Sequence, residues 1–256
     1  MSLQFSDTSN KNGIVQEVER ELGLDYGVIS GNTTKLKELT VAVNRALDDY
    51  TTLALKSSGE WQWDDSNHGD YPIIKTNLVD GQSSYLFTTD EQGNLILDIF
   101  KVLILPSATA TLYQEIYPID QQTKDHAPDI TAENTAEGVP YQYDKTANGI
   151  FLDPPSSYNA TNGLKVLINR EASYFTTVDT TRKPGIPGIH HEYIVVKAAY
   201  KLARRTGKTT QASLLAEVTK YEGNEERRIS GKIQEYFGKR NKDVAHVITP
   251  KLKPFL

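Results

Sequence analysis

Residues 184–207 read PGIPGIHHEYIVVKAAYKLARRTG, and this stretch separates a strand-rich part of the chain from a helical part. Pro184 and Pro187 lack the backbone N–H that a sheet uses, so the strands should end before them. Apolar residues then recur at helical spacing from Ile189 to Arg205, and Gly207 supplies a stop signal. The stretch therefore predicts that the chain leaves a sheet through a hinge and enters a long helix.

Helical periodicity also marks the two ends of the chain. Before the strand-rich part, apolar spacings of three and four predict helices over 14–22 and 36–50, the second of them preceded by an N-cap cluster at 30–34. After Gly207, the same pattern predicts a helix from about 209 to 221 and one or two helical turns near 229–237. We expect the C-terminal helices to pack on the N-terminal ones.

The middle of the chain has the pattern of strands and turns. Short runs of Tyr, Phe, Ile, Val and Thr alternate there with Gly, Pro, Asn and Asp. Hairpin turns are expected at 90–94 and 145–149, and a mobile loop over 121–138. We expect strands over 71–77, 84–88, 95–105, 111–117, 140–144, 149–152, 164–170 and 173–177.

These patterns predict an α+β protein. It consists of a helical domain made of N- and C-terminal helices, an inserted antiparallel β-sandwich-like domain and an extended C-terminal tail. The expected divisions are N-terminal helices over 1–56, the β-rich insert over 57–183, C-terminal helices over 184–238 and the tail over 239–256.

Composition excludes several classes of function. The chain has 256 residues and no cysteine, which rules out a disulfide framework, a thiolate nucleophile and Cys-ligated metal sites. No apolar run approaches the roughly 20 residues of a membrane-spanning helix, and the first residues lack the features of a signal peptide. We therefore expect a protein that is made inside the cell and has no membrane partner.

Charge is distributed unevenly along the chain. Residues 1–180 carry 12 Lys and Arg against 26 Asp and Glu, whereas residues 181–256 carry 16 against 7. A basic C-terminal end suits an acidic protein or nucleic acid as partner. From charge alone, a solvated helical segment rich in Lys and Arg is the more common explanation.

No motif in the sequence carries catalytic chemistry. The tripeptide 207–209 resembles the end of a P-loop, but Leu202 stands where that motif needs glycine. His190 and His191 are adjacent and diverge by about 100° on a helix, so we expect exposed imidazoles at a helix N-terminus. The acidic run 64–70 fits a turn, with a weak cation site as the lesser alternative. No carboxylate pair or nucleophile elbow has suitable spacing, so we expect no enzyme, cofactor or metal.

Aromatic residues are frequent in the strand-rich part, where they could form a stacking platform for sugars or bases. Core packing and cross-strand pairing are more common roles for aromatics at alternate strand positions. A non-catalytic β-sandwich carbohydrate-binding module is therefore the alternative hypothesis. The residues are Trp61, Trp63, Tyr71, Tyr85, Phe87, Tyr113, Tyr117, Tyr141, Tyr143, Tyr158, Tyr174 and Phe175.

The order of elements resembles that of the head-to-tail connector proteins of tailed bacteriophages, also called adaptor or neck-ring proteins. Ile150-Phe151-Leu152-Asp153-Pro154-Pro155, followed by the run 163–168, is similar to a strand, a Pro-containing loop and the next strand of such adaptors. Residues 187–202 resemble their return segment, an Ile-Pro followed by a helix rich in Ala and Tyr. Outside about 150–207, the resemblance lies in the order of elements, and the large acidic insert departs from the shortest family members.

The resemblance implies a structural, non-enzymatic virion protein. In that family the helical domains form a ring, of 12 subunits, in the neck between the capsid portal and the tail, and assembly takes place in the host cytoplasm. The implied partners are other copies of the chain, the portal protein, a downstream tail or neck protein, and genomic DNA that passes through the lumen without sequence-specific binding. Acidic residues facing the lumen would keep the DNA from sticking.

The last segment of the chain combines cations with an apolar content that a free disordered tail does not need. Burial against a partner would account for this content, and so would folding back onto its own domain; the resemblance favours docking into the portal. The expected portal-docking residues are Lys242, Val244, Val247, Ile248, Lys251, Leu252, Lys253, Phe255 and Leu256.

Overall fold

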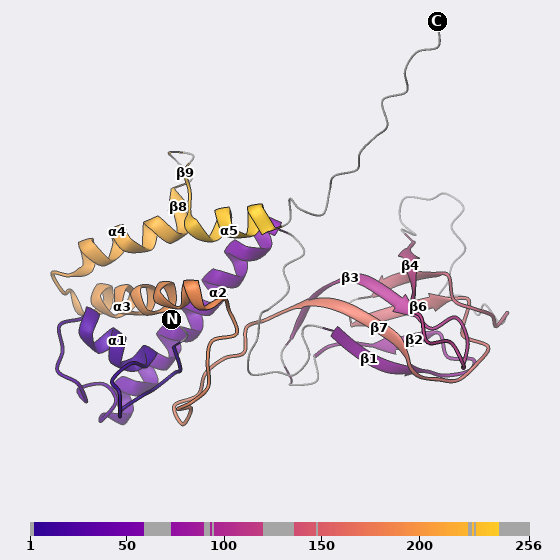
Figure 1. Ribbon diagram of the computed structural model, residues 1–256, viewed down its shortest axis with the longest axis horizontal. Coiled ribbons are helices and arrows are strands. Elements are labelled where there is room, and N and C mark those ends of the chain that lie inside the picture. Colours follow the sequence, from indigo (N-terminus) through magenta and orange to yellow (C-terminus); the bar gives the residue numbers. More distant parts are fainter. Residues whose placement is uncertain are drawn as a thin grey trace, which may run out of the picture. The chain divides into compact units, whose positions relative to one another are not determined.

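A computed structural model describes residues 3–58, 73–89, 93, 95–119, 136–146, 148–224, 227 and 229–240. The protein is α+β: N-terminal helices come first, a curled seven-stranded sheet is inserted, and C-terminal helices pack against the N-terminal ones (Figure 1). The chain divides into two compact units. We call Met1–Trp61 with Tyr174–Leu256 the helical unit, and Gln62–Ser173 the sheet unit. No helix within the described ranges is long and apolar enough to cross a membrane.

Five α-helices build the helical unit in its described part, at the places that the apolar periodicity predicts. In Figure 1, α3 runs beside α1 and α4, and it also contacts α2, while α5 contacts α2 and α4. A 3-10 turn, η1 (Gly188–His190), precedes α3, and a two-residue pairing of β8 (Gly223–Asn224) with β9 (Ile229–Ser230) separates α4 from α5. The helices are α1 (Ile14–Glu21), α2 (Thr33–Ser58), α3 (His191–Thr206), α4 (Gln211–Glu222) and α5 (Lys232–Arg240).

The predicted N-cap of α2 and the predicted glycine stop of α3 are both present. The Asn32 side-chain oxygen accepts the backbone N–H groups of Thr34 and Lys35 at 3.1 and 3.0 Å, which caps α2. At the end of α3, Gly207 has φ 65°, a left-handed conformation that glycine adopts without steric cost. Local side-chain chemistry therefore sets where these two helices begin and end.

The two adjacent histidines are buried, so the expectation of exposed imidazoles is wrong. His190 and His191 are 3% and 2% exposed. The Tyr50 hydroxyl lies 2.7 Å from Nδ1 of His190, and the backbone N–H of Leu3 donates to Nδ1 of His191 at 2.8 Å. His191 Nε2 lies 3.0 Å from the Ile186 carbonyl oxygen. Each imidazole thus has a polar partner from a distant segment, which is what allows a polar ring to be buried.

The sheet unit contains one seven-stranded sheet in the order β1-β7-β3-β4-β5-β6-β2. β4 and β5 pair in parallel, and the other neighbouring strands pair antiparallel. The sheet is therefore mixed, and the expected purely antiparallel arrangement is wrong in this respect. The strands are β1 (Ile73–Leu78), β2 (Ser84–Leu86), β3 (Ile96–Ile104), β4 (Gln114–Pro118), β5 (Gln142–Thr146), β6 (Gly149–Asp153) and β7 (Ala160–Arg170).

Strand β4 joins the two halves of the sheet and explains its curl. Its first part pairs with β3, placing Val102 opposite Ile116, and its last part pairs with β5, placing Tyr117 opposite Gln142. A strand that changes partners in this way turns the corner between two halves that face one another. Both halves therefore contribute to one apolar core, as in a sandwich, although they belong to a single sheet. Its members include Leu78, Ile99, Val102, Ile104, Ile116, Tyr143, Ile150, Leu152, Leu164, Val166 and Ile168.

One predicted strand is absent and one predicted hairpin is present. Residues 173–177 form no strand, because the backbone groups of Phe175 bond to the side-chain amide of Asn44 instead of a neighbouring strand, each at 2.9 Å. The hairpin at 145–149 joins β5 to β6, with Thr146 opposite Gly149. A Cβ at Gly149 would lie 2.0 Å from the Tyr85 carbonyl oxygen, so this position requires glycine. The predicted turn at 90–94 and loop at 121–138 fall mostly outside the described residues.

Candidate functional site

The residues predicted to dock into a portal lie beyond Arg240, outside the described residues, and the structure does not test them. The acidic run 64–70, the lesser candidate for a cation site, also lies outside the described residues. Within the described ranges, no group of three or more His, Asp or Glu side chains is arranged to hold a metal ion.

Trp61, Trp63 and Tyr71 of the predicted stacking platform lie outside the described residues, and most of its other aromatic residues are placed apart from one another. Tyr85, Phe87 and Tyr143 are buried in the core of the sheet unit, and burial raises the pKa of the Tyr85 and Tyr143 hydroxyls. Tyr117 and Tyr141 are 68% and 62% exposed, and the backbone N–H of Tyr117 donates to the Tyr141 carbonyl oxygen at 3.4 Å. Of the described platform residues, these two have the most exposed side chains, Tyr117 on β4 and Tyr141 just before β5.

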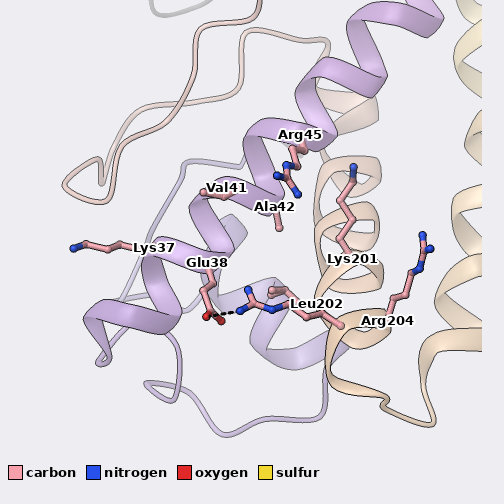
Figure 2. Close-up of a pocket in the computed structure, with 9 residues that line it drawn as sticks. Lys37, Glu38, Val41, Ala42, Arg45, Lys201, Leu202 and Arg204 are labelled. Carbon is pink, nitrogen blue, oxygen red and sulfur yellow. Dashed lines mark hydrogen bonds and ion pairs between the residues drawn. The ribbon is translucent and has the colours of Figure 1, made fainter.

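A groove of about 640 Å³ lies between the first half of α2 and the last turns of α3 (Figure 2). Its apolar surface comes from Val41, Ala42 and Leu202. We call this surface the basic groove, because five cationic side chains and one acidic side chain surround the apolar residues. The charged lining is Lys37, Glu38, Arg45, Lys201, Arg204 and Arg205.

The spacing of residues on α2 places two basic side chains and one apolar side chain on the same face of the helix. Lys37, Val41 and Arg45 follow one another at intervals of four, so they share one side of the helix. Figure 2 shows Arg45 of α2 and Lys201 of α3 extending into the space between the two helices. Val41 is 50% exposed between Lys37 and Arg45. The groove thus offers an apolar contact surrounded by cations.

The cations of the groove are only partly neutralised. Arg205 pairs with Glu38 at 3.0 Å, and Lys201 pairs with Asp49 at 2.9 Å. No carboxylate of the described part of the chain forms an ion pair with Lys37, Arg45 or Arg204. Three positive charges without an ionic partner among the described residues surround an apolar floor, and such an arrangement attracts an anionic surface.

A second hollow, of about 410 Å³, lies between α1 and the start of α3. Its charged residues are Glu17, Arg20, Glu21 and Glu192, and Arg20 is paired with Glu17. Glu192 accepts a hydrogen bond from the Tyr221 hydroxyl at 2.7 Å. We call this surface the acidic hollow. Its other lining residues are Leu3, Asn12, Gly188, Ile189, Val195 and Val196, of which Ile189 is 63% exposed.

The sequence analysis predicted the helix over 36–50 but did not predict the groove. The available signal was the stripe Lys37–Val41–Arg45, in which an apolar residue interrupts a basic face. That stripe becomes a groove only because α2 packs against the basic end of α3, a contact between segments far apart in the sequence. Comparison with protein-family models and with curated proteins finds no match to this chain.

Proposed function

We propose that the chain is a structural virion protein that forms a ring, connects the portal of a phage capsid to the tail, and lets DNA pass through the lumen. The observation that supports this proposal is the architecture of the helical unit. Both ends of the chain fold together into one helical body, and the sheet is inserted between them. This is the order of elements that the resemblance to head-to-tail connectors implies.

In this proposal, the residues after α5, 241–256, form the extended tail that enters the portal; the expected boundary at 239 shifts because α5 continues to Arg240. The chain places its cations toward this end, with 16 Lys and Arg among residues 181–256, while residues 1–180 are strongly acidic. An acidic lumen would repel the phosphate backbone and let DNA pass without binding. A downstream tail or neck protein would contact the opposite side of the ring.

Removal of the tail tests the docking role. Truncation after Arg240 leaves α5 complete and deletes the predicted docking residues. We expect the truncated protein to keep its circular dichroism spectrum and to lose binding to the purified portal of the same virus. Substitution of Lys239 by Gln in the full chain is the matched control, because it removes one exposed charge beside the tail and should leave binding intact. Unchanged assembly of the truncated protein onto the portal would show that the docking role is wrong.

The second candidate, a carbohydrate-binding module, has one observation in its favour. Tyr117 and Tyr141 expose most of their surfaces on neighbouring segments, and pairs of exposed tyrosines can stack on sugar rings. Saturation-transfer NMR against a panel of glycans separates the two candidates. A signal that disappears in Tyr117→Ala and in Tyr141→Ala favours the carbohydrate module, whereas the connector proposal expects no signal.

A further inference from the structure

We propose that the acidic hollow of one copy of the chain docks into the basic groove of the next copy, so that copies associate head to tail. This inference deepens the proposed function, on which it rests for the closure of the ring, by naming the surfaces through which neighbouring copies meet. The contact between two copies is argued from the charges, apolar residues and placement of the two surfaces.

The two surfaces carry opposite charge. In the basic groove, Lys37, Arg45 and Arg204 have no ionic partner among the described residues, and in the acidic hollow Arg20 is already occupied by Glu17. The acidic charge left over comes from Glu21, which is exposed, and Glu192, which accepts only from a neutral hydroxyl. Opposite charges on two partners steer the encounter and fix its register.

Each surface also exposes a β-branched side chain among its charges. Val41 is 50% exposed in the basic groove, and Ile189 is 63% exposed at the acidic hollow. A protein interface typically has an apolar centre within a polar rim, and each of these surfaces has that composition. Bringing Ile189 against the apolar floor formed by Val41 and Leu202 would bury both centres while their charged rims meet.

The charged residues that α3 contributes to the two surfaces lie on opposite sides of this helix. Glu192 and Lys201 are nine residues apart on α3, and so are Val196 and Arg205. Nine residues correspond to about two and a half turns of an α-helix, so the members of each pair point in opposite directions. Because the surfaces face away from each other, they cannot meet within one molecule. Their complementarity can be satisfied only between copies.

This placement determines the kind of symmetry. A contact that joins two different surfaces is heterologous, and its repetition gives a closed ring or an open filament. A two-fold dimer, in contrast, would bring the same surface of both copies together. The proposed contact is therefore of the type that a ring with more than two members requires.

Cysteine cross-linking tests the contact, because the natural chain contains no cysteine. The double variant Val41→Cys/Ile189→Cys places one thiol on each surface, at two exposed positions that tolerate substitution. The full-length protein is treated with a short bismaleimide, alone and on the portal, and separated under denaturing conditions. We expect a ladder of dimers, trimers and larger species from the double variant, and a dimer only when the two single variants are mixed.

The controls separate a specific contact from random collision. Each single variant alone should remain monomeric, and Val41→Cys/Leu215→Cys should give no ladder, since Leu215 is 44% exposed on α4 and lies outside both surfaces. A cross-linked dimer from Val41→Cys alone would indicate a symmetric contact and would overturn the proposal. The absence of a ladder from the double variant, both alone and on the portal, would overturn it as well.

Charge reversal provides a second, independent measurement. In the double-cysteine background, Arg45→Glu should reduce the ladder at least tenfold, and addition of Glu21→Arg in the same chain should restore it. Failure of the restoration would contradict the pairing of these two surfaces. The outcomes also distinguish this inference from the proposed function. If the double variant forms a ladder but does not bind the portal, the contact between copies is supported and the connector function is wrong. If the protein forms rings on the portal without the cross-link, the connector function is supported and the proposed contact is wrong.

Discussion

The two units of the molecule have cores of different chemistry. The core of the sheet unit consists mainly of Ile, Leu and Val contributed by both halves of one curled sheet. The core of the helical unit instead combines apolar side chains with Tyr50, Tyr193, Phe237 and two buried imidazoles. The sheet unit also buries Asp153, Asn169 and Arg170, but its apolar cluster is stabilised mainly by the burial of aliphatic side chains. The buried imidazoles of the helical unit are stable only while their partners and their neutral state are kept. The units should therefore differ in their response to pH and to loss of charge.

The largest effect is expected from Phe237→Ala in the helical unit. Phe237 is 1% exposed, and its ring packs against Tyr50, His190 and Tyr236. Its removal leaves a cavity beneath α5 and should lower the free energy of unfolding by about 4 kcal/mol. Urea denaturation gives the magnitude, and hydrogen exchange shows whether peptides from α2 and α5 lose protection while those of the sheet unit keep theirs. Equal loss of protection in both units would contradict the independence of the two cores.

The corresponding change in the sheet unit is Leu164→Ala, with a slightly smaller expected effect. Leu164 is fully buried on β7, where it lies opposite Thr76 of β1 and Ile104 of β3. We expect a loss of about 3 kcal/mol in the free energy of unfolding. The control is Leu86→Ala on β2, since Leu86 is 76% exposed and its truncation should cost less than about 0.5 kcal/mol.

The next largest difference in stability between the two units should appear when the pH is lowered. Burial, together with nearby His191 and Lys232, lowers the pKa of His190 to about 4, and burial also lowers the pKa of His191. Because an unfolded histidine titrates near 6.5, the unfolded chain takes up protons first as the pH falls. The stability contributed by neutral His190 is thus complete above 6.5 and is lost toward pH 4. Between pH 7 and pH 5, the helical unit should lose about 2 kcal/mol from this group.

Unfolding measured at both pH values checks this expectation. His190→Gln removes the titrating group and should reduce the difference between pH 7 and pH 5. The described part of the sheet unit contains no histidine, and its perturbed groups Tyr85, Tyr143 and Tyr158 have raised pKa values, far from this range. A sheet unit that loses as much protection as the helical unit at pH 5 would contradict the assignment.

The smallest expected difference comes from one lysine in each unit. Lys197 is 13% exposed in its side chain and pairs with both Asp49 and Glu222, whereas Lys145 is 43% exposed and pairs with Asp98 at 3.1 Å. Lys197→Met leaves Glu222 without its cation in a partly buried place, while Asp49 keeps its ion pair with Lys201, and the change should cost about 1.5 kcal/mol. Lys145→Met should cost less than about 0.5 kcal/mol, because exposed ion pairs contribute little. If urea denaturation gave equal losses in the free energy of unfolding for both variants, burial would not explain a difference between the two ion pairs.

The sequence predicted the features that depend on neighbouring residues. All five described helices lie where apolar spacing places them, and the Asn32 cap and the Gly207 stop act as their residue types indicate. The hairpin at 145–149 was also predicted, because its turn chemistry is local. Local sequence patterns were sufficient to predict the features that local hydrogen bonds determine.

The features that the sequence did not predict depend on distant partners. His190 is buried because Tyr50, 140 residues away, supplies its hydrogen bond, and Phe175 leaves the expected strand because Asn44 binds its backbone. The curl of the sheet follows from the change of partner along β4, and the basic groove from the packing of α2 on α3. The spacing of nearby residues does not identify the distant partner in any of these contacts, although the stripe Lys37–Val41–Arg45 marks one side of the groove.

The bond from Leu3 to His191, which joins positions 188 residues apart, has a consequence for synthesis on the ribosome. The first two helices emerge early, but the segment that completes their core is translated after the whole sheet. The sheet unit can therefore fold before α3 is synthesised, whereas α1 and α2 need α3 to complete their core. Biogenesis would run from the middle outward, in contrast to the usual order in which the N-terminal part folds first.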